Sequence, residues 1–190
     1  AADPDLAQAL AKAGRPPARH RPRGFEGLAR IIVAQQVSSA AAATMWNRLT
    51  AAVDPLEPAA VAALPFEMLR GCGLSRQKAA YVQHVAAEIA SGRLDLRKVH
   101  RLPDEPAVAA LTALKGIGRW SAEIYLLFAL RRPDVMPAGD LALQVAAQHL
   151  KGLRSRPSPE RLMRLAEAWR PHRSAAALLL WHYYHHLKGT

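Results

Sequence analysis

The sequence has one cysteine and no long apolar run. Cys72 alone excludes an intrachain disulfide framework and a four-cysteine iron–sulfur site, which makes a reducing, intracellular compartment the default. No apolar stretch approaches the length of a membrane-spanning helix, and the first residues hold no apolar signal-peptide core. We therefore expect an intracellular protein with no membrane partner.

Acidic residues are scarce as well. The chain of 190 residues has 15 Asp and Glu against 26 Lys and Arg, a net charge of +11. This balance favours a polyanionic partner, because a basic face attracts phosphates and releases their counterions. An all-α interaction protein with an incidental basic surface is the alternative, and it predicts salt-insensitive behaviour towards DNA. The length suits one core or two small lobes that share a cleft.

Strand-like alternation of apolar and polar residues is absent. Apolar residues recur instead at spacings of three and four, which predicts an all-α fold. The expected helices cover residues 4–13, 25–36, 38–53, 58–63, 65–71, 75–91, 104–114, 118–131, 140–150, 158–169 and 173–188. A glycine turn at 71–73 is interpreted as a corner between packed helices, with contact to a nucleic-acid backbone as the lesser alternative.

The most specific pattern lies between Leu114 and Leu143. Gly116-Ile117-Gly118 separates two helical patterns, and its unobstructed amides precede a helix that begins near Arg119, a place that attracts phosphate. Asp140 then starts a later helix, after a loop with two prolines and a glycine. Taken alone, Asp140 is an N-cap. A phosphate-binding hairpin followed by an isolated aspartate suggests a protein that binds a nucleic acid and catalyses a reaction on it.

Four tryptophans and a histidine group are the other candidates. Tryptophans pack into cores by default, but Trp120 follows the hairpin directly, where a flat π surface suits a flipped and cationic base. His182, His185 and His186 share a helix without a fitting third ligand, so we expect polar surface there and no metal site.

The segments LKGIGRWSAEIYLLFAL and MPAGDLAL resemble the helix-hairpin-helix DNA glycosylases, in particular the 3-methyladenine DNA glycosylase II (alkylbase) branch. Residues 25–38 and 165–181 resemble the first long helix and the final helices of that family. The resemblance implies two helical lobes that flank a DNA-binding cleft, without an iron–sulfur cluster. One lobe would cover about 38–138, with the hairpin at 112–121, and the other about 1–37 plus 139–190.

The resemblance also implies a role for individual residues. Asp140 matches the catalytic aspartate. The residues around the base pocket would be Trp120, Trp181, Ile124 and Tyr125. Those at the DNA phosphates would be Gly116, Gly118, Ser121, Lys115 and Arg119. The wedge that fills the minor-groove space left by a flipped base would come from Gln35, Gln36, Val37 and Ser38. The carbonyls of Thr112, Leu114 and Ile117 would hold a structural Na⁺ or K⁺ ion.

The sequence departs from the family pattern in several places. Trp120 stands where bifunctional relatives carry a lysine nucleophile, so no Schiff base and no AP lyase step are expected. Lys115 replaces a frequent proline and adds a charge near phosphate. Ile124 replaces a frequent aromatic residue, which leaves the substrate preference open. The β-rich N-terminal domain of some bacterial relatives is not found in this sequence.

The resemblance therefore implies a monofunctional DNA glycosylase for base excision repair. It would hydrolyse the N-glycosidic bond of alkylated purines, of the 3-methyladenine and 7-methylguanine type, in damaged double-stranded DNA after flipping the base. No cofactor would be required, and we expect a monomer of the cytoplasm or nucleoid. The alternatives are a non-catalytic helix-hairpin-helix DNA-binding module and a glycosylase for another class of lesion.

Overall fold

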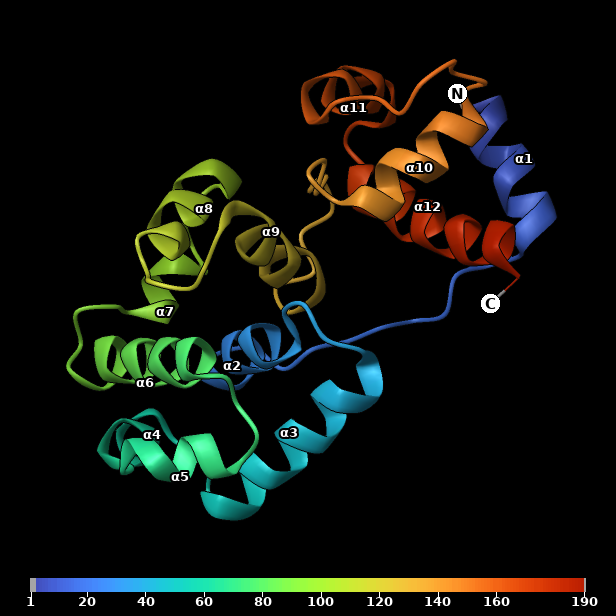
Figure 1. Ribbon diagram of the computed structural model, residues 1–190. Helices are drawn as coiled ribbons and strands as arrows, with labels where there is room; N and C mark the ends of the chain where they lie inside the picture. Colours follow the sequence, from blue (N-terminus) through green and yellow to red (C-terminus); the bar gives the residue numbers. More distant parts are fainter. Residues whose placement is uncertain (1–2, 190) are drawn as a thin grey trace. The chain divides into compact units, whose positions relative to one another are not determined.

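A computed structural model of the chain describes residues 3–189, and within that range its regular structure is helical, without strands (Figure 1). The chain divides into two compact units. The first, here called the hairpin unit, comprises Arg21–Tyr125. The second, the acid-loop unit, comprises the described residues up to His20 and from Leu126 onward. No helix within 3–189 is long and apolar enough to cross a membrane.

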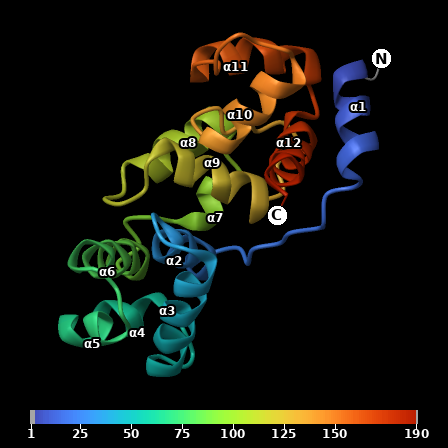
Figure 2. The ribbon, with the colours of Figure 1, turned by 45° about the vertical axis from the view of Figure 1, so that its right-hand side comes forward.

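The hairpin unit is built on α6 (Arg76–Ala90). The other helices that lie within it are α2 (Phe25–Ala34), α3 (Ser39–Ala52), α4 (Pro58–Ala63), α5 (Phe66–Gly71), α7 (Leu96–Val99) and α8 (Asp104–Thr112). Helices α4 and α5 pack on α6, which also contacts α2, and α2 contacts α3 (Figure 2). Helix α9 (Arg119–Phe128) continues from this unit into the next.

Helix α2 belongs to the hairpin unit because α6 holds its C-terminal end. The buried ammonium of Lys78 donates a 2.7 Å hydrogen bond to the carbonyl of Val33 and so satisfies one of the last carbonyls of α2. The expected lobes placed residues 25–36 with the C-terminal part of the chain. The observed division falls at 20/21 and 125/126 instead of 37/38 and 138/139.

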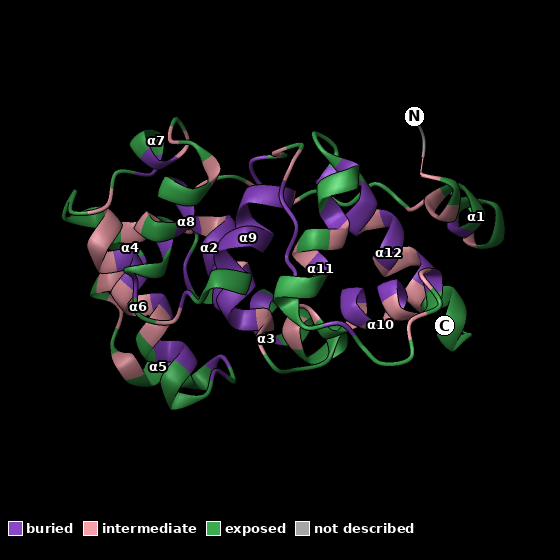
Figure 3. Cartoon of the chain, turned by 90° about the horizontal axis from the view of Figure 1, so that it is seen from above, coloured by how far each residue is buried: buried purple, intermediate pink, exposed green. Residues whose placement is uncertain are grey.

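The acid-loop unit is built on α12 (Arg173–Lys188). It packs against α10 (Leu141–Leu150) and α1 (Pro4–Ala13), and the unit also holds α11 (Pro159–Ala166) and a 3₁₀ turn at Glu167–Trp169. The buried faces of these helices are coloured purple in Figure 3. Their buried residues include many alanines, whose small side chains let helices approach closely.

Helix α1 is anchored through Asp3. Its carboxylate caps α1, accepts from the indole N–H of Trp169 at 2.6 Å and pairs with Lys151 at 2.9 Å. Burial raises the pKa of Asp3, but the hydrogen bonds from Trp169 and Lys151 outweigh it and lower the pKa to about 2. This network ties α1 to the C-terminal end of α10.

The helical prediction is confirmed, with differences at the helix ends. Helix α2 ends at Ala34, since Gln35 already has a non-helical ψ of 130°, and α9 ends at Phe128; both ends come earlier than expected. Gln36 and Arg131, beyond these ends, have positive φ angles of 53° and 56°. The four-residue helix α7 was not expected from the sequence, since it is too short to show periodicity.

Candidate functional site

The hairpin between α8 and α9 contains two glycines with different surroundings. Gly116 has a φ of +92°, and a Cβ atom at this position would overlap the ring of Tyr81. A Cβ atom at Gly118 would meet no heavy atom within 4 Å. Packing therefore requires glycine at 116 but not at 118, where the backbone is exposed at the start of α9. The amides of the first turn of α9 point out of such a helix end, where anions bind.

An open groove of about 1000 Å³ runs along this hairpin within the hairpin unit. Its walls come from the hairpin, the loop between α2 and α3, the 73–78 turn and Tyr81. Trp120 lies in the same groove with 40% of its surface exposed. The groove thus brings together backbone amides, an aromatic face and the predicted wedge loop.

The wedge loop is braced against the hairpin. The side-chain amide of Gln35 donates to the carbonyl of Gly116 at 2.9 Å and to the hydroxyl of Ser121 at 3.2 Å. Gln36 and Val37 are exposed at the tip of the loop, whereas Ser38 caps α3. Of the four predicted wedge residues, only Gln36 and Val37 project, while Gln35 fixes the loop.

Two predicted base-pocket residues are buried in the structure. Ile124 is 5% exposed and Tyr125 is fully buried. The Tyr125 hydroxyl accepts from the amide of Gly24 at 2.9 Å and lies 2.8 Å from Nε2 of His100, and burial raises its pKa to about 12. Tyr125 is therefore packed in the core of the hairpin unit, and the role of Ile124 and Tyr125 beside a flipped base stays a prediction.

Lys115 and Arg119, the two basic residues predicted to bind phosphate, differ in their contacts. Lys115 is exposed beside the hairpin. Arg119 pairs with Glu105 and, at 2.9 Å, with Glu123, so a phosphate has to compete with two carboxylates for its guanidinium. Burial raises the pKa of Glu123 to about 7, against the lowering effect of Arg119.

Asp140 is the N-cap of α10, as the sequence predicts. Its Oδ1 accepts from the amides of Ala142 at 2.9 Å and Leu143 at 3.2 Å. Its own amide donates to the carbonyl of Pro137 at 2.9 Å. These three bonds set the direction of the carboxylate, which is partly exposed.

The other aromatic and histidine predictions have separate outcomes. Trp181 stacks on Phe128 with 5.7 Å between the ring centroids, in the acid-loop unit, whereas Trp120 belongs to the hairpin unit. Trp46 and Trp169 are buried, which confirms them as core. His182 is not simply polar surface, because its Nε2 lies 2.8 Å from the carbonyl of Ala13. Within 3–189 no three His, Cys, Asp or Glu side chains form a group that could hold a metal ion.

The sequence did not identify the contacts that hold the loop before Asp140. Asp134 was interpreted as a polar loop residue, yet its carboxylate accepts two hydrogen bonds from the guanidinium of Arg173. Ser174, the neighbour of Arg173, also bonds to this loop. The only signal in the sequence was that Arg173 and Ser174 lie in the segment 165–181, which resembles the family.

Comparison with known proteins agrees with this arrangement. The sequence profile of the HhH-GPD superfamily base excision DNA repair proteins matches residues 29–171. DNA-3-methyladenine glycosylase 1 of Schizosaccharomyces pombe is 34% identical over 161 residues, which are 83% of this chain and 71% of that protein.

Two solved structures are similar over nearly all of this chain. The S. pombe 3-methyladenine DNA glycosylase Mag1, solved in complex with abasic DNA, has a TM-score of 0.84 at 32% identity, over 94% of this chain and 90% of that one. A DNA-3-methyladenine glycosidase from Bacillus halodurans has a TM-score of 0.85 at 34% identity, over 96% and 85%. The chain belongs to the HhH-GPD superfamily of base excision DNA repair proteins.

Proposed function

We propose that this chain is a monofunctional DNA glycosylase, which hydrolyses the N-glycosidic bond of alkylated purines in duplex DNA and leaves an abasic site. The observation that carries the proposal is the capped carboxylate of Asp140, in a chain whose hairpin and flanking helices match those of alkylbase glycosylases. The abasic DNA bound to S. pombe Mag1 is the product expected of this reaction.

The chemistry requires one carboxylate. Alkylation at N3 or N7 places positive charge on the purine, so the base departs as a neutral leaving group and no strong general acid is needed, in contrast to the paired carboxylates of glycosidases. Asp140 stabilises the oxocarbenium character that develops at C1′, and it orients or deprotonates the attacking water. The amides of Ala142 and Leu143 hold one oxygen of the carboxylate in place before substrate arrives. Since water is the only other reactant, no cofactor enters the reaction.

The hairpin groove supplies the binding energy for opening the duplex. Flipping one nucleotide costs a few kcal/mol. The first amides of α9, with Lys115 beside them, bind the phosphates, and the exposed tip formed by Gln36 and Val37 fills the vacated space in the stack. Trp120 offers its face to the flipped base, and its π electrons favour a cationic one.

A structural alkali cation remains part of the proposal. The carbonyl oxygens of Thr112, Leu114 and Ile117 are hard donors that suit Na⁺ or K⁺, which accept oxygen ligands. Although the Leu114 carbonyl accepts from the amide of Ile117 at 3.2 Å, a carbonyl oxygen has a second lone pair for a cation. The ion would stiffen the hairpin and would take no part in bond cleavage.

Strand cleavage is not part of the proposed reaction. The indole of Trp120 cannot form a Schiff base with an abasic sugar, whereas a lysine at that position could. The natural partner is damaged double-stranded DNA, bound by a monomer inside the cell. Strand breaks are therefore expected only after heat or alkali acts on the abasic product.

The proposal is tested by release of free base from alkylated duplex DNA, with the wild type and Asp140→Asn compared. Release by the wild type alone, with strand breaks only after heat or alkali, supports a monofunctional alkylbase glycosylase that uses Asp140. Absence of release by the wild type, with tight and salt-dependent binding to DNA, favours a non-catalytic helix-hairpin-helix module. Release only from DNA with oxidised or mismatched bases points to another class of lesion.

A further inference from the structure

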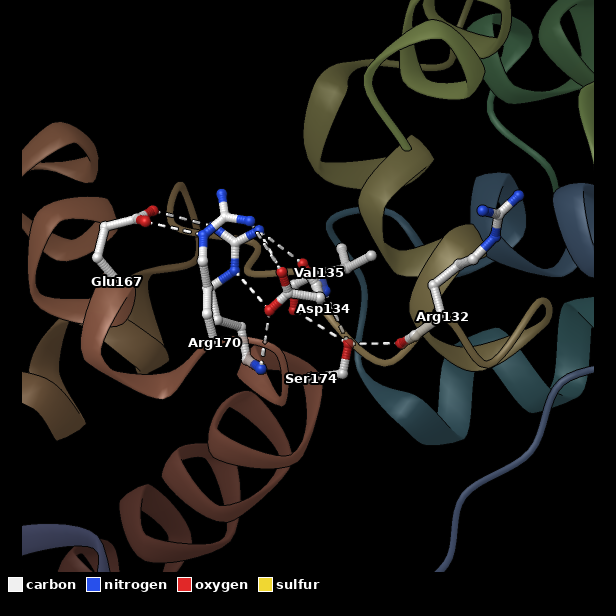
Figure 4. Close-up of polar contacts among 7 residues, drawn as sticks. Arg132, Asp134, Val135, Glu167, Arg170 and Ser174 are labelled. Atoms are coloured by element: carbon white, nitrogen blue, oxygen red, sulfur yellow. Dashed lines mark hydrogen bonds and ion pairs between the residues drawn. The ribbon is translucent and has the colours of Figure 1, made fainter. Parts of the chain in front are cut away.

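The loop that leads to Asp140 is held at its start by Ser174 of α12 (Figure 4). The Ser174 hydroxyl lies 2.6 Å from the carbonyl oxygen of Arg132 and accepts from the amide of Val135 at 2.9 Å. The Ser174 amide donates to the carbonyl of Pro133 at 3.0 Å. One buried serine therefore satisfies backbone groups of three loop residues.

Arg173 holds the remaining residue of this stretch. Its guanidinium donates to the carbonyl of Asp134 at 2.9 Å and to both carboxylate oxygens of Asp134 at 2.8 and 3.0 Å. Glu167 and Arg170 complete the network on its exposed side (Figure 4). A forked contact of this kind fixes both the position and the plane of its partner.

The far end of the loop is held separately. The buried side-chain amide of Gln144, one turn into α10, donates to the carbonyl of Ala138 at 2.8 Å. Asp140 follows two residues later. The loop is thus fixed by polar groups both where it begins and where it delivers Asp140 to α10.

Arg173, Ser174 and Gln144 pair with carbonyl groups of the loop that are partly or fully buried, and such groups cost free energy when they lack a partner. Arg173 is only 7% exposed, and removing a charge from water offsets most of what its ion pair contributes. Apolar side chains of similar volume would leave these carbonyl groups without a partner, and they would not define the direction in which the carbonyl groups point. What the polar contacts add is one definite backbone conformation.

We propose that Arg173, Ser174 and Gln144 are positioning residues, which fix the loop so that the carboxylate of Asp140 is placed for reaction. The inference rests on the function proposed above, in which Asp140 acts at C1′ of the flipped nucleotide. Displacement of a reacting group by about 1 Å can slow a reaction about 100-fold. The three residues act through Asp140, without touching the substrate.

The test uses Ser174→Ala, which removes the hydroxyl from a helix that tolerates alanine, and Gln144→Met, which removes the amide at similar volume. We expect each to lower the single-turnover rate of base release about 10- to 100-fold. The dissociation constant for duplex DNA with an abasic site should stay within about threefold of the wild type, because the hairpin unit is unchanged. Arg173→Ala is avoided, since it strands the carboxylate of Asp134 and endangers folding.

Lys151→Met is the matched control. It breaks the ion pair with Asp3 at the other end of α10, in the same unit and away from the loop. Its melting temperature should fall at least as far as those of the two test variants, while its rate of base release stays at the wild-type value.

Three outcomes would overturn the inference. If Ser174→Ala and Gln144→Met release base at the wild-type rate, the loop contacts have only a structural role. The proposed function of Asp140 would not be affected by that result. Rate and DNA affinity that fall together would indicate general damage to the fold. A wild type that releases no base would overturn the proposed function and this inference with it.

Discussion

The hairpin between α8 and α9 and the loop between α9 and α10 are both short glycine-containing connections, yet they are held in different ways. The hairpin borders an open groove, and its support is the side-chain amide of Gln35 and the ring of Tyr81. The loop between α9 and α10, here called the acid loop, is held by hydrogen bonds from the buried residues Arg173, Ser174 and Gln144. A surface that binds DNA through backbone amides needs those amides exposed. A carboxylate that takes part in a reaction needs a backbone with one fixed conformation.

The largest effect should come from the acid loop itself. Both Asp140→Asn and Asp140→Ala should slow base release about 100- to 10,000-fold, because neither side chain carries the negative charge. Asparagine also caps helices, so only the alanine variant should lose about 1 kcal/mol of unfolding free energy. Base-release kinetics and urea denaturation measure the two properties. If Asp140→Asn keeps its activity, Asp140 serves only as the N-cap of α10.

Variants at Gln36 and Gln35 test whether the loop between α2 and α3 helps to open the duplex. Gln36→Ala should slow excision from alkylated duplex DNA about tenfold and leave excision from single-stranded DNA unchanged, because only the duplex has a stack to open. Gln35→Ala loosens the loop but keeps the tip, so its loss should be smaller. Equal losses on both substrates would argue against a wedge.

The two hairpin glycines separate folding from binding. Gly116→Ala should cost about 1 to 3 kcal/mol of unfolding free energy, because its Cβ atom overlaps the ring of Tyr81 at a positive φ. Gly118→Ala should stay within about 0.5 kcal/mol of the wild type, since the Cβ atom meets no neighbour. A methyl group there partly covers the first amides of α9, so we expect DNA affinity to fall several-fold. Unchanged affinity in Gly118→Ala would argue against phosphate at this helix end.

The basic residues beside the hairpin should differ in their salt dependence. Lys115→Ala should reduce the slope of log affinity against log salt concentration by about one, as expected for the loss of a phosphate contact. Arg119→Ala should change the slope less, because Glu105 and Glu123 already pair with the guanidinium. Titration of a labelled duplex at several salt concentrations measures both slopes. A larger change for Arg119→Ala would show that DNA displaces the carboxylates.

The last prediction concerns the pH dependence of stability and leaves base release aside. The pKa of Glu123, raised by burial to about 7, lies above its ordinary value of 4.5, so the folded chain holds this proton more tightly than the unfolded chain. Its contribution to stability is present below about pH 4.5 and lost as the pH rises through 7, a change of roughly 1 to 3 kcal/mol. Glu123→Gln should flatten the stability curve across that window. Parallel curves for the two proteins would contradict the raised pKa.

Much of the fold was predictable because helices follow from local patterns. Apolar spacing located most helices, and Asp140 caps α10 as predicted. In the structure Ser38, Ser75 and Ser158 cap three further helices. The helix ends after Ala34 and Phe128 were missed, since neither residue is followed directly by a glycine or proline that would mark the end of a helix.

The site was predictable in part, through motif and resemblance. The hairpin, Asp140 and the exposed Trp120 lie where the motif indicates. The resemblance placed Ile124 and Tyr125 around the base pocket, but it did not predict that both side chains are buried. Arg119 and Gln35 were assigned to DNA. The structure pairs Arg119 with Glu105 and Glu123, and it pairs Gln35 with the distant Gly116 and Ser121.

By itself the sequence determined the helices, the glycine hairpin, the capped aspartate and the basic charge, all of which depend on neighbours within a few residues. Only the tertiary structure decided that Gln35 braces the hairpin, that Glu105 pairs with Arg119, and that Arg173 and Ser174 hold the loop before Asp140. Most of these contacts join residues far apart in the chain, and their geometry exists only after the helices have packed and removed the polar groups from water.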